Sequence, residues 1–110
     1  MAIKHAVSGQ AVSVRPLGTK LGSARTSAIF KSRDLELMHL VLLAGKGLPS
    51  HKVDGEITIQ CIEGRLKVSA DGREQVLEAG DLLYLAGGMP HAVDALADSS
   101  ALVTVALVRP

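Results

Sequence analysis

Residues 65–78, RLKVSADGREQVLE, have the pattern of a β-hairpin. Polar and apolar residues alternate over positions 65–70, which is the period of a strand with one buried face. Asp71-Gly72 follows, and this pair favours a tight two-residue turn because both residues tolerate positive φ. Residues 73–78 return as the second strand. We therefore predict two adjacent antiparallel strands here.

Outward from the hairpin, four more runs have the length and composition of strands. Residues 57–62 are β-branched and apolar, and residues 82–85 lie between glycine-containing turns. Residues 102–108 are so uniformly apolar that we expect burial on both faces. Residues 35–43 would also suit a helix, but the glycines and proline that follow favour a strand. Turn residues recur about every eight to twelve positions, which predicts an all-β sandwich or barrel.

The composition fits one globular domain and excludes several classes of function. The chain has 110 residues, 47% of them apolar, which is enough for a core without disulfides. A formal net charge of +1 argues against a nucleic-acid partner, and one Tyr and one Phe give no platform for stacking bases. Cys61 is the only cysteine, and we expect it to be a small buried hydrophobe rather than a nucleophile.

No stretch has the length and hydropathy of a signal peptide or a membrane span. The first fifteen residues are too polar for a signal peptide. The longest apolar run, residues 40–44, is far short of the about 20 residues that cross a bilayer. We expect a cytoplasmic protein without a membrane partner.

Histidines are the first candidates for chemistry, because imidazole is a common metal ligand and titrates near neutral pH. His5 lies near the N-terminus and His39 in an apolar run, so we expect surface or structural roles for both. His51 follows a turn expected at residues 45–50, and His91 follows a similar one. The charges of the hairpin are expected to form a solvated face; they are Arg65, Lys67, Arg73 and Glu74.

Around these two histidines the sequence resembles the cupin superfamily of small β-barrels, which carry two signature motifs. The first motif reads glycine, five residues, His-x-His, three or four residues, glutamate, six residues, glycine. The second reads glycine, five residues, Pro-x-Gly, two residues, histidine, three residues, asparagine. The matching residues are Gly45, His51 and Gly64 in the first motif, and Gly80, Gly88 and His91 in the second.

The resemblance implies a single-domain cupin-like β-barrel, or jelly roll, over residues 28–110, with residues 1–27 as an irregular segment or edge strand. Cupins commonly form dimers through their sheets, which implies a homodimer. The resemblance also implies a pocket for a small molecule inside the barrel. We expect its lining to include His51, His91, Val53, Ile57 and Tyr84.

A metal site is a further implication, but the sequence departs from the family's ligand set. In metal-binding cupins, two histidines and a glutamate of the first motif and the histidine of the second hold one ion. Here Val53 replaces a histidine and Ile57 replaces the glutamate, so His51 and His91 are left. Two neutral imidazoles are a poor site for a divalent Zn, Fe, Mn or Ni ion, which takes three or four protein ligands.

Three residues are candidates for a third ligand: Glu56, Asp54 and His39. Glu56 stands one position before the family's glutamate, and a shift of one residue turns a strand side chain to the opposite face. If the strand is regular, the side chains at positions 57, 59 and 61 point inward and that of Glu56 points outward. A bulge just before it would reverse this arrangement.

Three functions stay open on the sequence. The first is a binding or sensory module for a small, mostly apolar molecule with one polar handle. The second is a metal-dependent dioxygenase- or isomerase-like enzyme that uses His51, His91 and a non-standard third ligand. The third is metal-free acid-base chemistry, as in sugar-epimerase-like cupins, with a histidine base and Tyr84 as proton donor. We favour the first, because two of the four expected metal ligands are replaced.

Overall fold

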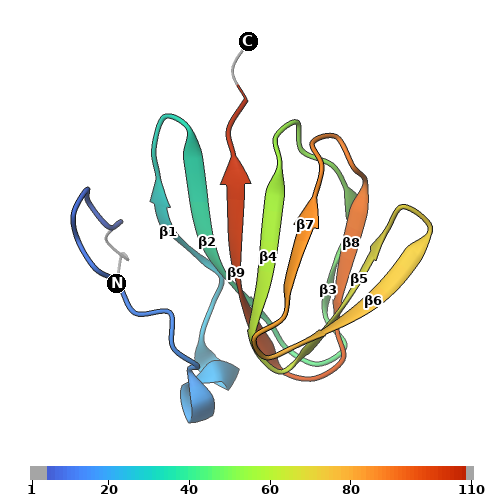
Figure 1. The fold of residues 1–110 in the computed structure, drawn as a ribbon. Coiled ribbons are helices and arrows are strands. Elements are labelled where there is room, and N and C mark those ends of the chain that lie inside the picture. Colours follow the sequence, from blue (N-terminus) through green and yellow to red (C-terminus); the bar gives the residue numbers. More distant parts are fainter. Residues whose placement is uncertain (1–4, 109–110) are drawn as a thin grey trace.

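The regular structure of the chain is almost entirely β-strand (Figure 1). The computed structural model describes residues 5–108, and within them one 3₁₀ helix, η1 Gly18–Ser23, precedes the strands. The strands are β1 Ser27–Lys31, β2 Leu35–Leu42, β3 Gly47–His51, β4 Ile57–Glu63, β5 Arg65–Ala70, β6 Arg73–Glu78, β7 Leu82–Leu85, β8 His91–Ala95 and β9 Ser99–Ala106. This confirms the all-β class expected from the spacing of turn residues.

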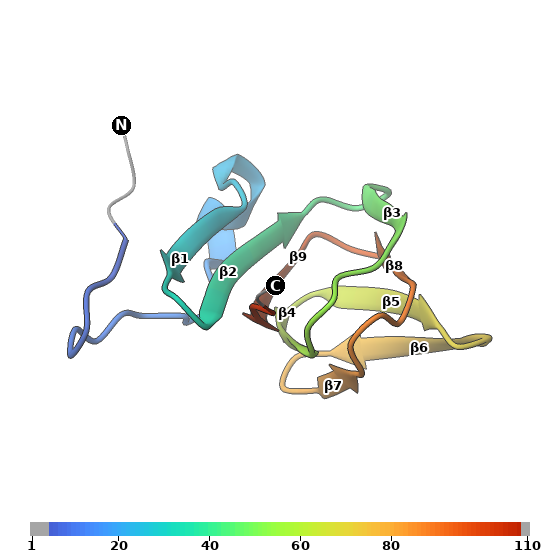
Figure 2. The same ribbon diagram turned by 90° about the horizontal axis from the view of Figure 1, so that it is seen from above.

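The strands form two antiparallel sheets that face each other. One has the order β1-β2-β9-β4-β7 and the other the order β3-β8-β5-β6. Seen from above, the second sheet lies beside the far end of the first, and β6 and β7 lie near each other (Figure 2). Because β6 and β7 are both edge strands, the barrel is not closed between them.

The β5–β6 hairpin confirms the prediction made from residues 65–78. Ala70 pairs with Arg73, which leaves Asp71 and Gly72 as the two-residue turn. Both turn residues have positive φ, 52° and 72°. Positive φ at both central positions is the geometry that matches the twist of a hairpin. β2, β4 and β7 likewise lie where the sequence predicts strands.

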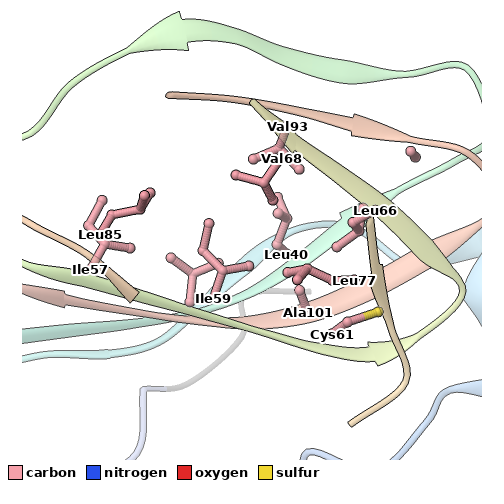
Figure 3. Packing of buried hydrophobic residues seen from close by; sticks show 12 residues of the cluster. Leu40, Ile57, Ile59, Cys61, Leu66, Val68, Leu77, Leu85, Val93 and Ala101 are labelled. Atoms are coloured by element: carbon pink, nitrogen blue, oxygen red, sulfur yellow. The ribbon is translucent and has the colours of Figure 1, made fainter. Parts of the chain in front are cut away.

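The hydrophobic core lies between the two sheets (Figure 3). Along β4, Ile57, Ile59 and Cys61 are buried, whereas Glu56 just before the strand is exposed. The strand is therefore regular in the sense that the sequence predicts, and the alternation puts its apolar residues on the inner face. The buried cluster contains Leu40, Ile57, Ile59, Cys61, Leu66, Val68, Leu77, Leu85, Val93, Ala95, Ala101 and Val103.

Three local expectations need correction. β3 occupies most of the turn expected at residues 45–50, and Gly47 permits it because a Cβ there would collide with Asp94 of β8. β1 occupies residues expected in part to be irregular. β9 is buried on its inner face only, since Leu102 and Thr104 on the outer face are half-buried.

The N-terminal residues of the described chain follow the outer side of the five-stranded sheet. The backbone N–H of Ala6 donates to the carbonyl of Ile29 in β1. β1 begins at Ser27, one residue before the expected boundary at 28, and residues 1–4 and 109–110 lie outside the described residues. Among residues 5–108, no helix is long and apolar enough to cross a membrane.

Candidate functional site

His51 and His91 lie side by side in the second sheet. His51 ends β3, His91 begins β8, and the two are paired in register. Their ring centroids are 4.5 Å apart, and the ring planes are tilted by 53°. His91 is 4% exposed and shares the inner face with Val93 and Ala95, whereas His51 is exposed at the rim. The two histidines that the sequence singles out therefore form one pair.

The hydrogen bonds of the two rings determine which nitrogen faces a ligand. The Nδ1 atom of His51 is 3.1 Å from the carbonyl oxygen of Pro49, and that of His91 is 3.0 Å from the carbonyl oxygen of Met89. A carbonyl oxygen only accepts, so each Nδ1 carries the proton and donates it. In the neutral ring Nε2 is then an acceptor. The pair therefore presents two acceptor nitrogens, and within residues 5–108 neither has a hydrogen-bond partner.

The loop that follows His51 and the loop that precedes His91 are joined through their backbones. The N–H of Gly88 donates to the carbonyl of Val53 over 2.8 Å. Gly87 lies against the carbonyl of Asp54, where a Cβ would collide with the oxygen. Gly88 has φ of 78°, a conformation that L side chains rarely adopt. These two glycines thus allow the close approach that fixes the loops relative to each other.

Of the other expected pocket residues, Val53 and Ile57 contact the core, whereas Tyr84 lines the cavity described below. Val53 is half-buried and packs against the core. Ile57 is 4% exposed and belongs to the core itself. Tyr84 is 59% exposed, pairs with Thr58, and its hydroxyl donates to Oε1 of Glu56 over 3.4 Å. Its strand register places Tyr84 on the outer face, because Leu83 and Leu85 face inward.

A cavity of about 280 Å³ opens beside the histidine pair, between β5, β6 and β7. Ala70, which pairs with His91, lines it, and so does Met89, whose carbonyl accepts from His91. The whole lining consists of Val68, Ala70, Asp71, Arg73, Gln75, Leu83, Tyr84, Leu85, Ala86 and Met89. The histidines themselves do not line the cavity; they lie beyond Ala70 on the same inner face of the sheet.

Arg73 is exposed, as expected for the solvated hairpin face with Arg65, Lys67 and Glu74. It also lines the cavity, which the sequence does not predict. Lys67 and Glu74 do form an exposed ion pair of 3.1 Å. The alternation along β6 carried the missing signal, because Leu77 is buried and Arg73 lies an even number of residues before it.

The sequence matches the Cupin domain family over residues 38–107, well over half of the chain. This chain is a cupin. Solved structures with the same fold include a conserved protein of unknown function from Streptococcus pyogenes, at 16% identity, 100% coverage of both chains and a TM-score of 0.76. An RmlC-like cupin from Shewanella frigidimarina shares 19% identity over 97% of this chain and 94% of that chain, with a TM-score of 0.74.

Enzymes are also among the similar structures. The DMSP lyase DddQ from Ruegeria pomeroyi shares 20% identity over 86% of this chain and 52% of that chain, with a TM-score of 0.69. A comparison with curated protein sequences gave no significant match. At these identities the structural matches show the cupin fold alone.

The residues of this cupin do not fit the three- or four-ligand metal site of the family. In residues 5–108 no three His, Cys, Asp or Glu side chains lie close enough to hold a metal ion. Glu56 is engaged with Tyr84, and Asp54 is exposed. His39 alternates with buried Leu40 and so faces the opposite side of β2. Within residues 5–108, none of the three candidates, Glu56, Asp54 and His39, joins the pair to form a group of three ligands.

Cys61, in the interior of the cupin, has a packing role. Burial raises the pKa of the Cys61 thiol, and the nearby charge of Asp81 adds to this, so the uncharged form is favoured. Its Sγ lies 3.5 Å from the carbonyl oxygen of Glu63. A neutral, fully buried thiol is a weak nucleophile, which agrees with the expected packing role.

Proposed function

We propose that this cupin binds a small organic molecule at the open end of its barrel, against the Nε2 atoms of His51 and His91. The observation that supports this most is the pair itself. Both rings are held by carbonyl groups of their own loops, and both present an acceptor nitrogen without a protein partner. The neighbouring cavity has a mixed lining, with apolar Val68, Leu83 and Leu85 beside polar Arg73 and Gln75, which suits a small molecule that has both apolar and polar parts.

The geometry sets the chemistry of the ligand atom that meets the pair. Two acceptor nitrogens attract a hydrogen-bond donor, such as a hydroxyl group, and repel a second acceptor. The ring of His91 is buried, so a donor that reaches it forms its hydrogen bond away from bulk water, where such bonds are stronger. The apolar residues of the neighbouring cavity, such as Val68, Leu83 and Leu85, accommodate the hydrocarbon part of the ligand.

The test is a ligand screen by NMR on isotope-labelled protein with three matched variants. The relevant ligands are those that shift the NMR signals of the first residues of β8. We expect their affinity to fall about tenfold in His91→Ala and in His51→Ala. His5→Ala is the control, because His5 lies in the N-terminal segment and outside the pair. Equal affinity in all three variants would overturn the proposed site.

The alternative is a metal-dependent enzyme of the dioxygenase or isomerase kind, in which the same two histidines hold a divalent ion. The resemblance to cupins that bind metals supports it, and the donor set opposes it. Elemental analysis of untagged wild type and His51→Ala decides between the two. We expect no stoichiometric metal in either protein; near-stoichiometric Zn, Fe, Mn or Ni that disappears in the variant would favour the enzyme.

We also propose that the cupin is a homodimer that joins through the outer face of the five-stranded sheet. Leu82 and Tyr84 are 63% and 59% exposed on that face of β7. Exposed apolar residues on a sheet face are typical of an interface. We expect sedimentation velocity to give a dimer for wild type and a monomer for Leu82→Lys. A monomer mass for wild type at every concentration would refute the dimer.

A further inference from the structure

Four residues form one row across the inner face of the second sheet. Ala70 of β5 pairs with Arg73 of β6 on one side and with His91 of β8 on the other, and His91 pairs with His51 of β3. Side chains of directly paired residues lie on the same face of a sheet. The row therefore carries a guanidinium group at one end, two imidazoles at the other and a methyl group between them.

The small side chain of Ala70 makes room between the two polar ends. Neighbouring strands are about 4.8 Å apart, so the Cα atoms of Arg73 and His91 are separated by about 10 Å. The cavity of about 280 Å³ occupies this place, since Ala70, Arg73 and Met89 all line it. Val68, Leu83 and Leu85 give it an apolar floor. Neither histidine lines the cavity, but His91 is paired with Ala70 in the same row, so a molecule that extends from the cavity past Ala70 would reach both ends of the row.

Arg73 is a charged group without a protein counterion. Among residues 5–108 the ion pairs within 4.0 Å are Arg33 with Asp34 and Lys67 with Glu74. Asp71 also lines the cavity, at the hairpin turn, and is not within that distance of Arg73. A guanidinium group matches the planar geometry of a carboxylate. The single positive charge, with Asp71 nearby, favours a monoanion over a dianion such as a phosphate monoester.

From this row we infer that the ligand is a small hydroxy-monocarboxylate. Its carboxylate meets Arg73, its hydroxyl group donates to Nε2 of the imidazole pair, and its hydrocarbon part lies over Ala70. This inference rests on the proposed binding function and adds the chemical class of the ligand. Gln75, which also lines the cavity next to Val68, supplies a further hydrogen-bonding group for the carboxylate.

The test is an NMR titration with lactate, hydroxyisobutyrate and mandelate, each compared with its amide and with the acid that lacks the hydroxyl group. We expect at least one hydroxy acid to bind, and its amide to bind about tenfold more weakly because the charge-assisted hydrogen bond to Arg73 is lost. Arg73→Gln should weaken the acid by a similar factor and leave the amide unchanged. Arg65→Gln is the matched control, because Arg65 lies on the outer face of β5.

The outcomes separate the ligand class from the site. Amides that bind as well as acids, or acids that bind Arg73→Gln as well as wild type, would overturn the carboxylate assignment while the histidine site stands. If Arg73→Gln weakens the binding of the acids but His51→Ala and His91→Ala do not, the carboxylate assignment stands and the proposed histidine site is overturned. No binding of any acid in the millimolar range would overturn the hydroxy-monocarboxylate class, whatever the wider ligand screen finds.

Discussion

The two ends of the barrel interior are built on the same strands but from different residues. At one end, Leu66 of β5, Leu77 of β6 and Ala95 of β8 are 1%, 4% and 3% exposed and close the core. At the other end the same inner faces carry Ala70, Arg73 and His91. A change of four positions along each strand thus converts a sealed hydrophobic core into an open polar row.

The difference teaches how a small cupin divides its residues between stability and binding. At the closed end the inner residues of β5, β6 and β8 are apolar, and the burial of such side chains is the dominant favourable contribution to folding. The open end places charged and polar groups where further apolar residues would have stabilised the fold. Residues that break the inner apolar pattern without a structural partner are the expected positions for function.

The largest effect is expected from a cavity at the closed end. Leu66→Ala removes a side chain that is 1% exposed, and such a change costs about 2–5 kcal/mol in the free energy of unfolding. Urea denaturation followed by circular dichroism measures it. Leu96→Ala, at a leucine that is 46% exposed in a loop, is the matched control and should stay within about 0.5 kcal/mol of wild type. Similar losses in both variants would contradict the division between the two ends.

The next effect sharpens the comparison at the open end. Ala70→Leu fills the space between Arg73 and His91, so we expect ligand affinity to fall by more than about tenfold. The unfolding free energy should change by less than about 1 kcal/mol, because the cavity has room for the added atoms. NMR titration and urea denaturation measure the two quantities. Ala92→Leu, on the outer face of β8, should leave ligand affinity unchanged. If this variant also loses affinity, the larger side chain weakens binding by disturbing the fold and not by filling the cavity.

The strands of this cupin were largely predictable from the sequence, for a physical reason. The β5–β6 hairpin and β4 show local alternation with turn residues at their ends, and this information needs no distant partner. β1 and β3 were missed because they are edge strands of their sheets. β3 contains Gly47 and Pro49, which an edge strand tolerates. In the sequence alone, these two residues indicate a turn.

The candidate site was predictable only in part. The two motifs pointed to His51 and His91, and the structure pairs these residues across β3 and β8. The sequence could not show that Arg73 joins their row, because that depends on pairings between β6, β5 and β8. It also could not show that His39 faces the N-terminal segment, with its Nε2 atom buried and unpartnered within the described chain.

The smallest effect concerns the outside of the closed end, where Glu63 holds the N-terminal segment. Its carboxylate accepts hydrogen bonds from the backbone N–H groups of Leu17 and Gly18, at 2.8 and 3.0 Å, and from the hydroxyl group of Ser100. Partial burial raises the pKa of Glu63, but these hydrogen bonds outweigh burial and hold the pKa below its usual range. The ionised carboxylate is therefore the form that stabilises the fold.

Glu63→Gln tests this contribution through its pH dependence. Because the folded pKa is lowered, the stabilisation is fully present above the ordinary glutamate pKa and is lost as the pH falls through the folded value. We expect Glu63→Gln to cost about 1 kcal/mol in urea denaturation at neutral pH, and less as the pH falls below that range. Glu78→Gln, at an exposed glutamate of β6, should cost nothing measurable at either pH. If Glu63→Gln costs the same free energy of unfolding at neutral and at acidic pH, the charge of Glu63 does not contribute to stability. The N-terminal segment would then be held at the closed end by packing alone.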